Sequence, residues 1–157
     1  MSKWNAASVF VSGWMALTLT LFPFGSNPAM AQGGGRCDRN QESFGFKIPD
    51  YPIEHQGQAL LNIQVDYRFI TTRPLQTEDY INYVPLAQEI DQFLRRYPNE
   101  TEYWEILNKN LVDFILEKYP SIGSLRVQVD VSPNVAALYA RSSTVLKTRS
   151  NNCPLLQ

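Results

Sequence analysis

The sequence is short of the residues from which metal sites and nucleophilic sites are built. It has one histidine, His55, and two cysteines, Cys37 and Cys153, among 157 residues. These three residues do not supply a tetrahedral ligand set at any recognised spacing, so we expect no metal. His55 has no serine or cysteine at nucleophile spacing, which argues against a catalytic triad. We expect no cofactor.

An excess of charge of one sign is also missing. The chain has 14 basic and 15 acidic residues, which gives no electrostatic reason to bind nucleic acid, and we expect no such partner. The glycine run at 33–35 is not followed by the helix and lysine of a phosphate-binding loop, which excludes that kind of nucleotide site. With 44% hydrophobic and 18% charged residues, the composition is that of a globular protein.

An uncharged apolar run from Ala6 to Phe24 follows Lys3 and precedes the small-residue site Ala29-Met30-Ala31. This order is typical of a signal peptide. We expect cleavage after Ala31, export to a periplasm, a lumen or the extracellular space, and a mature chain that is not attached to a membrane. An uncleaved anchor is the alternative, because a spanning helix needs about 20 apolar residues and the run approaches that length.

The predicted organisation has four parts: a signal peptide over 1–31, a flexible linker over 32–42, a folded domain over 43–149 and a C-terminal tail over 150–157. Export would allow Cys37 and Cys153 to form a disulfide that joins the two ends of the mature domain. Closing so long a loop contributes roughly 4 to 5 kcal/mol at best. Two free thiols remain the alternative.

Alternation of apolar and polar residues predicts strands at both ends of the domain. A brief strand runs from Phe44 to Ile48 and is ended by the prolines that follow. From Leu61 to Phe69 every odd-numbered residue is apolar and every even-numbered residue is polar, as in a half-buried strand. Alternation returns from Leu125 to Val131, and a mixed run from Leu138 to Thr148 predicts a fourth strand.

Between these strands the apolar period becomes helical. Pro85 can begin a first helix and Pro98 ends it, and Asn99 is predicted to cap a second helix that Pro120 closes. The first apolar stripe consists of Leu86, Ile90, Phe93, Leu94 and Tyr97. The second consists of Trp104, Leu107, Leu111, Phe114 and Ile115.

Paired strands on either side of two helices predict an α+β fold, with an antiparallel sheet that carries both helices on one face. The opposite face is polar, as the even-numbered residues from Asn62 to Arg68 show. We therefore expect this face to lie in water or to line the inside of an oligomeric barrel.

Three short motifs stand in a characteristic order. They are Gly57-Gln58 before the long strand, Thr77 to Val84 before the first helix, and Tyr103 to Leu111 at the start of the second. In order and spacing they resemble the motifs of the dihydroneopterin aldolase family, over about Ser43 to Arg149. The resemblance implies the tunnelling fold, which has two strands, two helices and two strands. Subunits of that fold join their sheets into barrels with sites at the subunit boundaries, so it also implies a homo-oligomer.

The resemblance assigns roles to three residues. Glu105 matches the glutamate that anchors the pterin, and a carboxylate there accepts charge-assisted hydrogen bonds from the substrate's amino and ring N–H groups. Tyr83 matches a tyrosine beside the substrate side chain, where a phenol exchanges a proton during catalysis. Glu54 lies near an acidic substrate-binding residue of the family's first loop. Family enzymes act in folate synthesis and cleave dihydroneopterin to hydroxymethyl-dihydropterin and glycolaldehyde, without metal or Schiff base.

The sequence departs from the family at Ser132, which stands where the enzymes have a catalytic lysine. A hydroxyl group does not supply the ammonium that helps to manage proton transfer. Two classes of function therefore stay open. One is a pterin-binding carbon–carbon lyase of the dihydroneopterin aldolase type, and the other is a non-catalytic, exported, oligomeric binding or assembly module on the same fold.

Overall fold

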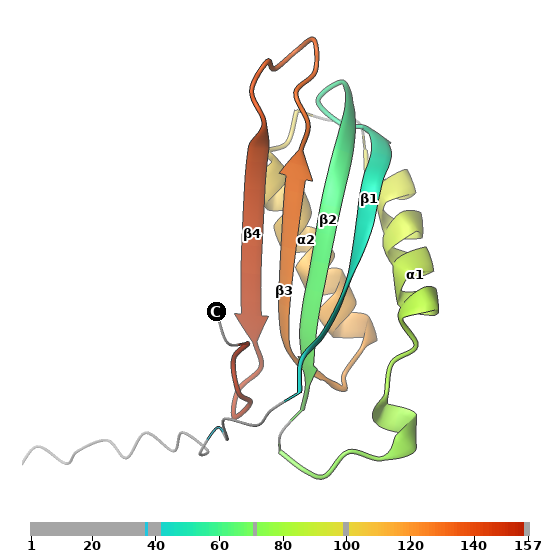
Figure 1. The fold of residues 1–157 in the computed structure, drawn as a ribbon, viewed down its shortest axis with the longest axis vertical. Coiled ribbons are helices and arrows are strands. Elements are labelled where there is room, and N and C mark those ends of the chain that lie inside the picture. Colours follow the sequence, from blue (N-terminus) through green and yellow to red (C-terminus); the bar gives the residue numbers. More distant parts are fainter. Residues whose placement is uncertain (1–36, 38–41, 71, 99–100, 156–157) are drawn as a thin grey trace, which may run out of the picture. The chain divides into compact units, whose positions relative to one another are not determined.

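The computed structural model describes residues 37, 42–70, 72–98, 101–155, and they form a four-stranded antiparallel sheet with two helices on one face (Figure 1). In chain order the elements are β1 (Phe44–Glu54), β2 (Gln58–Phe69), the 3-10 helix η1 (Thr77–Asp79), α1 (Tyr83–Arg96), α2 (Trp104–Lys118), β3 (Ile122–Val131) and β4 (Arg141–Thr148). The strands lie in the sheet in the order β1-β2-β3-β4. The predicted α+β fold class is confirmed. The predicted signal peptide and most of the linker lie outside the described residues.

The alternating residues of β2 and β3 form the centre of the core. Leu61 pairs with Val131, Ile63 with Val129 and Val65 with Val127, so apolar side chains from both strands point to the same face. All six are at least 99% buried, and the apolar stripes of α1 and α2 pack against them, with Phe93, Tyr97 and Phe114 only partly buried. Within the described residues no helix is long and apolar enough to cross a membrane.

The first strand is longer than predicted. β1 continues past Pro49 and Pro52 to Glu54, with a break in register between Ile48 and Tyr51 and a positive φ of 47° at Asp50. The expected stop at the prolines was wrong because β1 is an edge strand, where a residue without an N–H can be accommodated and a bulge can absorb the extra length.

Two other predicted boundaries were wrong. α2 does not begin at Asn99 but at Trp104, after Tyr103, whose side chain makes no capping bond. The last strand begins at Arg141 and not at Leu138, because the preceding residues form the connection between β3 and β4. Asn134 forms a turn there, because its side-chain oxygen accepts hydrogen bonds from the backbone N–H groups of Ala136 and Ala137.

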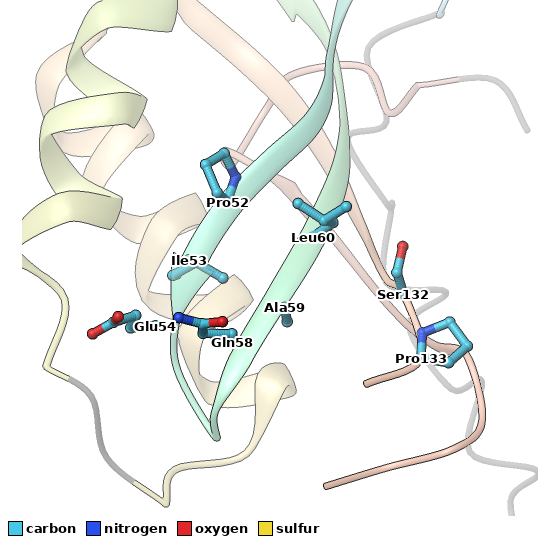
Figure 2. A pocket seen from close by; sticks show the side chains of 8 residues that line it. All are labelled: Pro52, Ile53, Glu54, Gln58, Ala59, Leu60, Ser132 and Pro133. Atoms are coloured by element: carbon cyan, nitrogen blue, oxygen red, sulfur yellow. The ribbon is translucent and has the colours of Figure 1, made fainter. Parts of the chain in front are cut away.

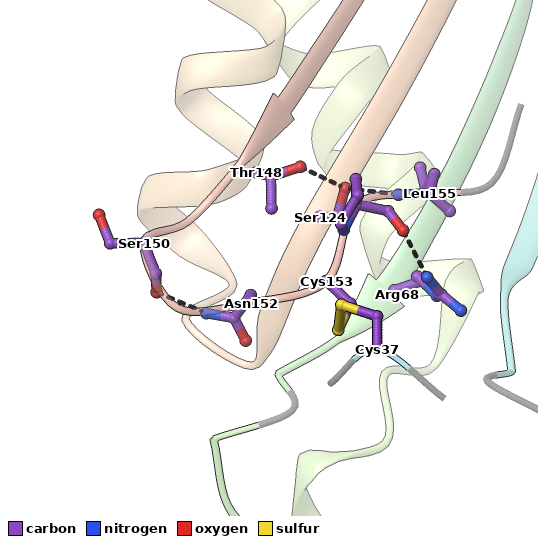
Figure 3. Close-up of a disulfide and its surroundings, with 9 residues drawn as sticks. Cys37, Arg68, Ser124, Thr148, Ser150, Asn152, Cys153 and Leu155 are labelled. Atoms are coloured by element: carbon purple, nitrogen blue, oxygen red, sulfur yellow. Dashed lines mark hydrogen bonds between the residues drawn. A yellow bond between two sulfur atoms is a disulfide. The ribbon is translucent and has the colours of Figure 1, made fainter. Parts of the chain in front are cut away.

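The C-terminal segment covers one end of the sheet face that the helices leave open (Figure 3). Cys153 is bonded to Cys37, with an S–S distance of 2.02 Å. The backbone N–H of Leu155 donates to Ser124 Oγ at 3.2 Å, and Arg68 donates to the carbonyl of Pro154. Arg68 is therefore buried, which corrects the expectation that it faces water.

Replacing Cys37 and Cys153 by serine should lower the free energy of unfolding by at most about 4 to 5 kcal/mol, because the bond closes a long loop in the unfolded chain. Guanidinium titration of the double variant, compared with the wild type with and without reductant, measures this loss. Equal midpoints for all three samples would contradict the expectation.

Two tyrosines should make the folded domain sensitive to alkali. The pKa of Tyr51 is raised to about 12, mainly by burial and then by the hydrogen bond to Asp91. The pKa of Tyr119 is also raised to about 12, mainly by burial and then by the hydrogen bond to Glu89. The folded state therefore holds these protons more tightly than the unfolded state, whose tyrosines titrate near pH 10. This stability is complete below about pH 10 and is lost as the pH rises through about 12.

Replacing both tyrosines by phenylalanine should flatten the decline in the free energy of unfolding between about pH 10 and 12. Denaturant titrations across this range measure the slope, and Tyr139→Phe, at an exposed position, is the matched control. A double variant that loses stability as steeply as the wild type would show that these phenols do not cause the decline.

Candidate functional site

Three connections meet at one end of the sheet, which we call the hairpin end (Figure 1). They are the β1–β2 turn, the α1–α2 connection and the β3–β4 connection. Gln56 of the β1–β2 turn donates to the carbonyl of Glu102 and accepts from Arg141 Nη1 at 3.2 Å. Asn134 Nδ2 donates to the carbonyl of Gln58 at 2.9 Å. Side-chain bonds thus bring three stretches that are distant in the sequence to one place.

His55 is a structural anchor of the hairpin end. Its side chain is fully buried, and its ring packs edge-on against Trp104 with the ring centres 4.7 Å apart. Nδ1 lies 3.2 Å from the carbonyl oxygen of Pro98, and Nε2 lies 3.0 Å from that of Glu102. Both neighbouring atoms are acceptors, so the neutral ring donates to one of them, and either tautomer ties the histidine to the α1–α2 connection. These contacts account for it without a catalytic role.

A hollow of about 470 Å³ lies at the hairpin end, beside the β1–β2 hairpin (Figure 2). Its lining consists of Pro52, Ile53, Glu54, Gln58, Ala59, Leu60, Ser132 and Pro133. Figure 2 shows Glu54 and Gln58 on the hairpin, with Ser132 and Pro133 on the neighbouring segment. The structure therefore brings Glu54 and Ser132 to one hollow, although 78 positions of sequence numbering separate them.

Glu105 also lies at the hairpin end, in the first turn of α2, and it is exposed. Within the described part of the chain, its carboxylate takes part in no ion pair or hydrogen bond. A negative charge in the first turn is favoured by the helix dipole, so the position suits a carboxylate even without a ligand. Glu105 does not line the hollow beside Glu54.

Tyr83 lies away from the hairpin end. It is the first residue of α1 and is 58% exposed, with its ring centre 6.1 Å from that of Phe46. The two helices are antiparallel, because Glu89 in the middle of α1 binds Lys118 at the end of α2, whereas Tyr97, just after α1, contacts Asn110 in the middle of α2. One chain therefore does not bring Tyr83 and Glu105 together.

The loop that carries the Thr77 to Val84 motif forms a second hollow, of about 570 Å³, at the opposite end. The two terminal guanidinium nitrogen atoms of Arg73 each donate to one carboxylate oxygen of Asp79, both at 2.6 Å. The pKa of Asp79 lies below its usual range, mainly because of the hydrogen bonds from Arg73 and, after these, because of the bond from the backbone N–H of Gln76. This ion pair fixes the loop that leads into α1.

Arg141 is a further polar residue of the hairpin end, and the sequence reasoning missed it. Its guanidinium carbon lies 5.6 Å from the centre of the Trp104 ring. Its Nε and Nη2 are buried and have no hydrogen-bond partner among the described residues, and the same holds for Trp104 Nε1. A single arginine at the start of a strand carries no motif, so no sequence signal marks it.

No group of histidine, cysteine, aspartate and glutamate residues in the described ranges could hold a metal ion. No protein-family model matches the chain, and no curated protein matches it. Among solved structures, a dihydroneopterin aldolase from Burkholderia thailandensis, bound to guanine, is similar, with a TM-score of 0.48 and 15% identity. The likeness covers 70% of this chain and 93% of that one, is distant, and concerns the fold alone.

Proposed function

We propose that the mature chain is an exported protein that binds a flat heterocycle of the pterin type between two copies of itself. The observation that carries this proposal is the exposed carboxylate of Glu105, which no described residue engages. The motifs around Glu105 and Tyr83 resemble those of pterin enzymes, and the strand and helix order is the one that this resemblance implies. The proposed place of export rests on the apolar run and small-residue site near the N-terminus.

Glu105 would recognise the ligand by accepting hydrogen bonds from its amino group and neighbouring ring N–H. Two parallel charge-assisted bonds of this kind are stronger than neutral ones and fix the plane of the heterocycle. Because the carboxylate is exposed and unengaged within the described residues, a ligand displaces only water from it.

Tyr83 would enter the site from a neighbouring copy. Tyr83 is exposed and lies far from the hairpin end of its own chain. A site that contains both Tyr83 and Glu105 therefore needs two chains. In a ring of identical subunits built in this way, the start of α1 in one copy would face the start of α2 in the next.

The site favours binding over carbon–carbon cleavage. Ser132 borders the hollow with a hydroxyl group, and Arg141 at the hairpin end presents a planar guanidinium and not an amine. Neither residue can act as the lysine does in the family enzymes. We therefore propose that the protein holds its ligand with little or no retro-aldol turnover.

A specific observation also favours the second class, an assembly module. Val135, Leu138 and Tyr139 of the β3–β4 connection are largely exposed, and the Asn134 turn holds this segment in place. Exposed apolar side chains that are held at one end of a domain are typical of a contact surface. Such a surface is compatible with ligand binding at the same oligomer.

Glu105→Gln should weaken the binding of dihydroneopterin about ten- to hundredfold, because the amide replaces two charge-assisted bonds by weaker or mismatched ones. Fluorescence titration of the purified mature protein measures the dissociation constant. Glu117→Gln, at an exposed position on the same helix, is the matched control. A wild type that does not bind at millimolar protein, or a Glu105→Gln variant that binds equally well, would reject the proposal.

Chains with Tyr83→Ala and chains with Glu105→Gln should each bind poorly, whereas co-assembled mixtures should recover binding. In a random one-to-one mixture, about a quarter of the boundaries join an intact Tyr83 to an intact Glu105. The stoichiometry of ligand binding, measured after joint refolding, checks this fraction. A mixture that stays as weak as its parents, or a wild type that is monomeric at high concentration, would contradict a site between copies.

A further inference from the structure

Arg141 presents two hydrogen-bond donors that nothing described in the chain satisfies. Its Nη1 is already occupied, because it donates to Gln56 Oε1 at 3.2 Å. Nε and Nη2 are buried without a partner among the described residues. These two nitrogen atoms lie on the same edge of the planar guanidinium, so their N–H bonds form a fork that matches two neighbouring acceptor atoms. Buried donors without acceptors cost free energy, so an acceptor pair delivered to this edge is favoured.

Arg141 and Glu105 belong to the same side of the domain. Asn108 of α2 donates to the carbonyl and hydroxyl oxygen atoms of Ser143 in β4. Residues three apart share a helix face, so Glu105 lies one turn before Asn108 on the side of α2 that faces β4. Arg141 lies two residues before Ser143, on the same face of β4, and stacks over Trp104, the neighbour of Glu105.

Charges of both signs lie at the hairpin end. Glu54, Glu102 and Glu105 lie at this end with Arg141, and Arg95 and Arg96 lie there in the last turn of α1. The Glu102 carboxylate is engaged by Tyr97 Oη at 2.6 Å. Because the two signs balance, no net positive charge attracts an anion here, whereas Arg141 and Glu105 present donors and an acceptor that a neutral ring can match.

We infer that Arg141 is a second ligand-binding residue, which donates to a ring carbonyl oxygen and to the acceptor nitrogen across the ring fusion from it, while Glu105 accepts from the amino and ring N–H groups on the other side of that carbonyl. This inference rests on the proposed function and specifies its ligand as a fused amino-oxo ring with neighbouring oxygen and nitrogen acceptors. Arginine binds the corresponding oxygen and nitrogen of guanine in the same bidentate way. Because the free edge is shielded in this structure, ligand binding in this way requires the half-buried guanidinium to turn outward.

The test compares pterin with 5-deazapterin, in which a C–H replaces the acceptor ring nitrogen while the edge that faces Glu105 is unchanged. The wild type should bind pterin about ten- to hundredfold more tightly than the deaza analogue. In Arg141→Met this preference should vanish, and both ligands should bind about as weakly as the analogue binds to the wild type. Arg141→Lys, which keeps the charge and loses the fork, should also lose the preference.

Arg96→Met, which removes an exposed arginine from α1, should keep the preference, and circular dichroism confirms that each variant is folded. A wild type that binds both ligands equally, or an Arg141→Met variant that keeps the preference, would overturn the role of Arg141 and leave the proposed function intact. A wild type that binds neither ligand would overturn the proposed function and this inference with it.

Discussion

The packing of the two central strands against α2 is the constraint on which the rest of the structure depends. β2 and β3 are paired so that odd-numbered residues face odd-numbered residues, and these apolar side chains share one buried face. A slip by one residue would turn every one of them toward solvent. This register fixes where the turns, the helix ends and the β3–β4 connection lie, and hence which side chains gather at the hairpin end.

Buried polar residues then lock the outer parts of the domain to this core. Asn108 ties α2 to β3 and β4 through the carbonyls of Val127 and Ser143, at 3.1 and 3.0 Å. His55 ties the β1–β2 turn to the α1–α2 connection, and Arg68 ties β2 to the C-terminal segment. Each of these side chains is buried and donates or accepts at least one hydrogen bond, which reduces its desolvation cost. His55 holds the hairpin end, and Arg68 holds the opposite end of the sheet.

The two residues that the family resemblance ranks highest occupy different ends of one chain. Antiparallel helices, each joined to the other by a short connection, place the start of α1 far from the start of α2. Motif similarity along a sequence therefore identifies residues of one site without showing that they belong to one chain. In the site that we propose, Tyr83 and Glu105 are halves of a boundary between two copies, and Arg141, which no motif includes, joins them.

The two central strands, the first helix and the α+β class can be predicted from the residue pattern, because burial imposes periods of 2 and 3.6 residues that are visible without any partner. Tertiary structure alone decided that β1 continues through its prolines, that α2 begins at Trp104, and that Arg68 is buried. These outcomes depend on a strand being at an edge, on a connection being anchored by His55, and on a distant C-terminal segment that covers the sheet. Arg141 belongs to the second group as well, since its importance lies in two donors that only the folded chain leaves without acceptors.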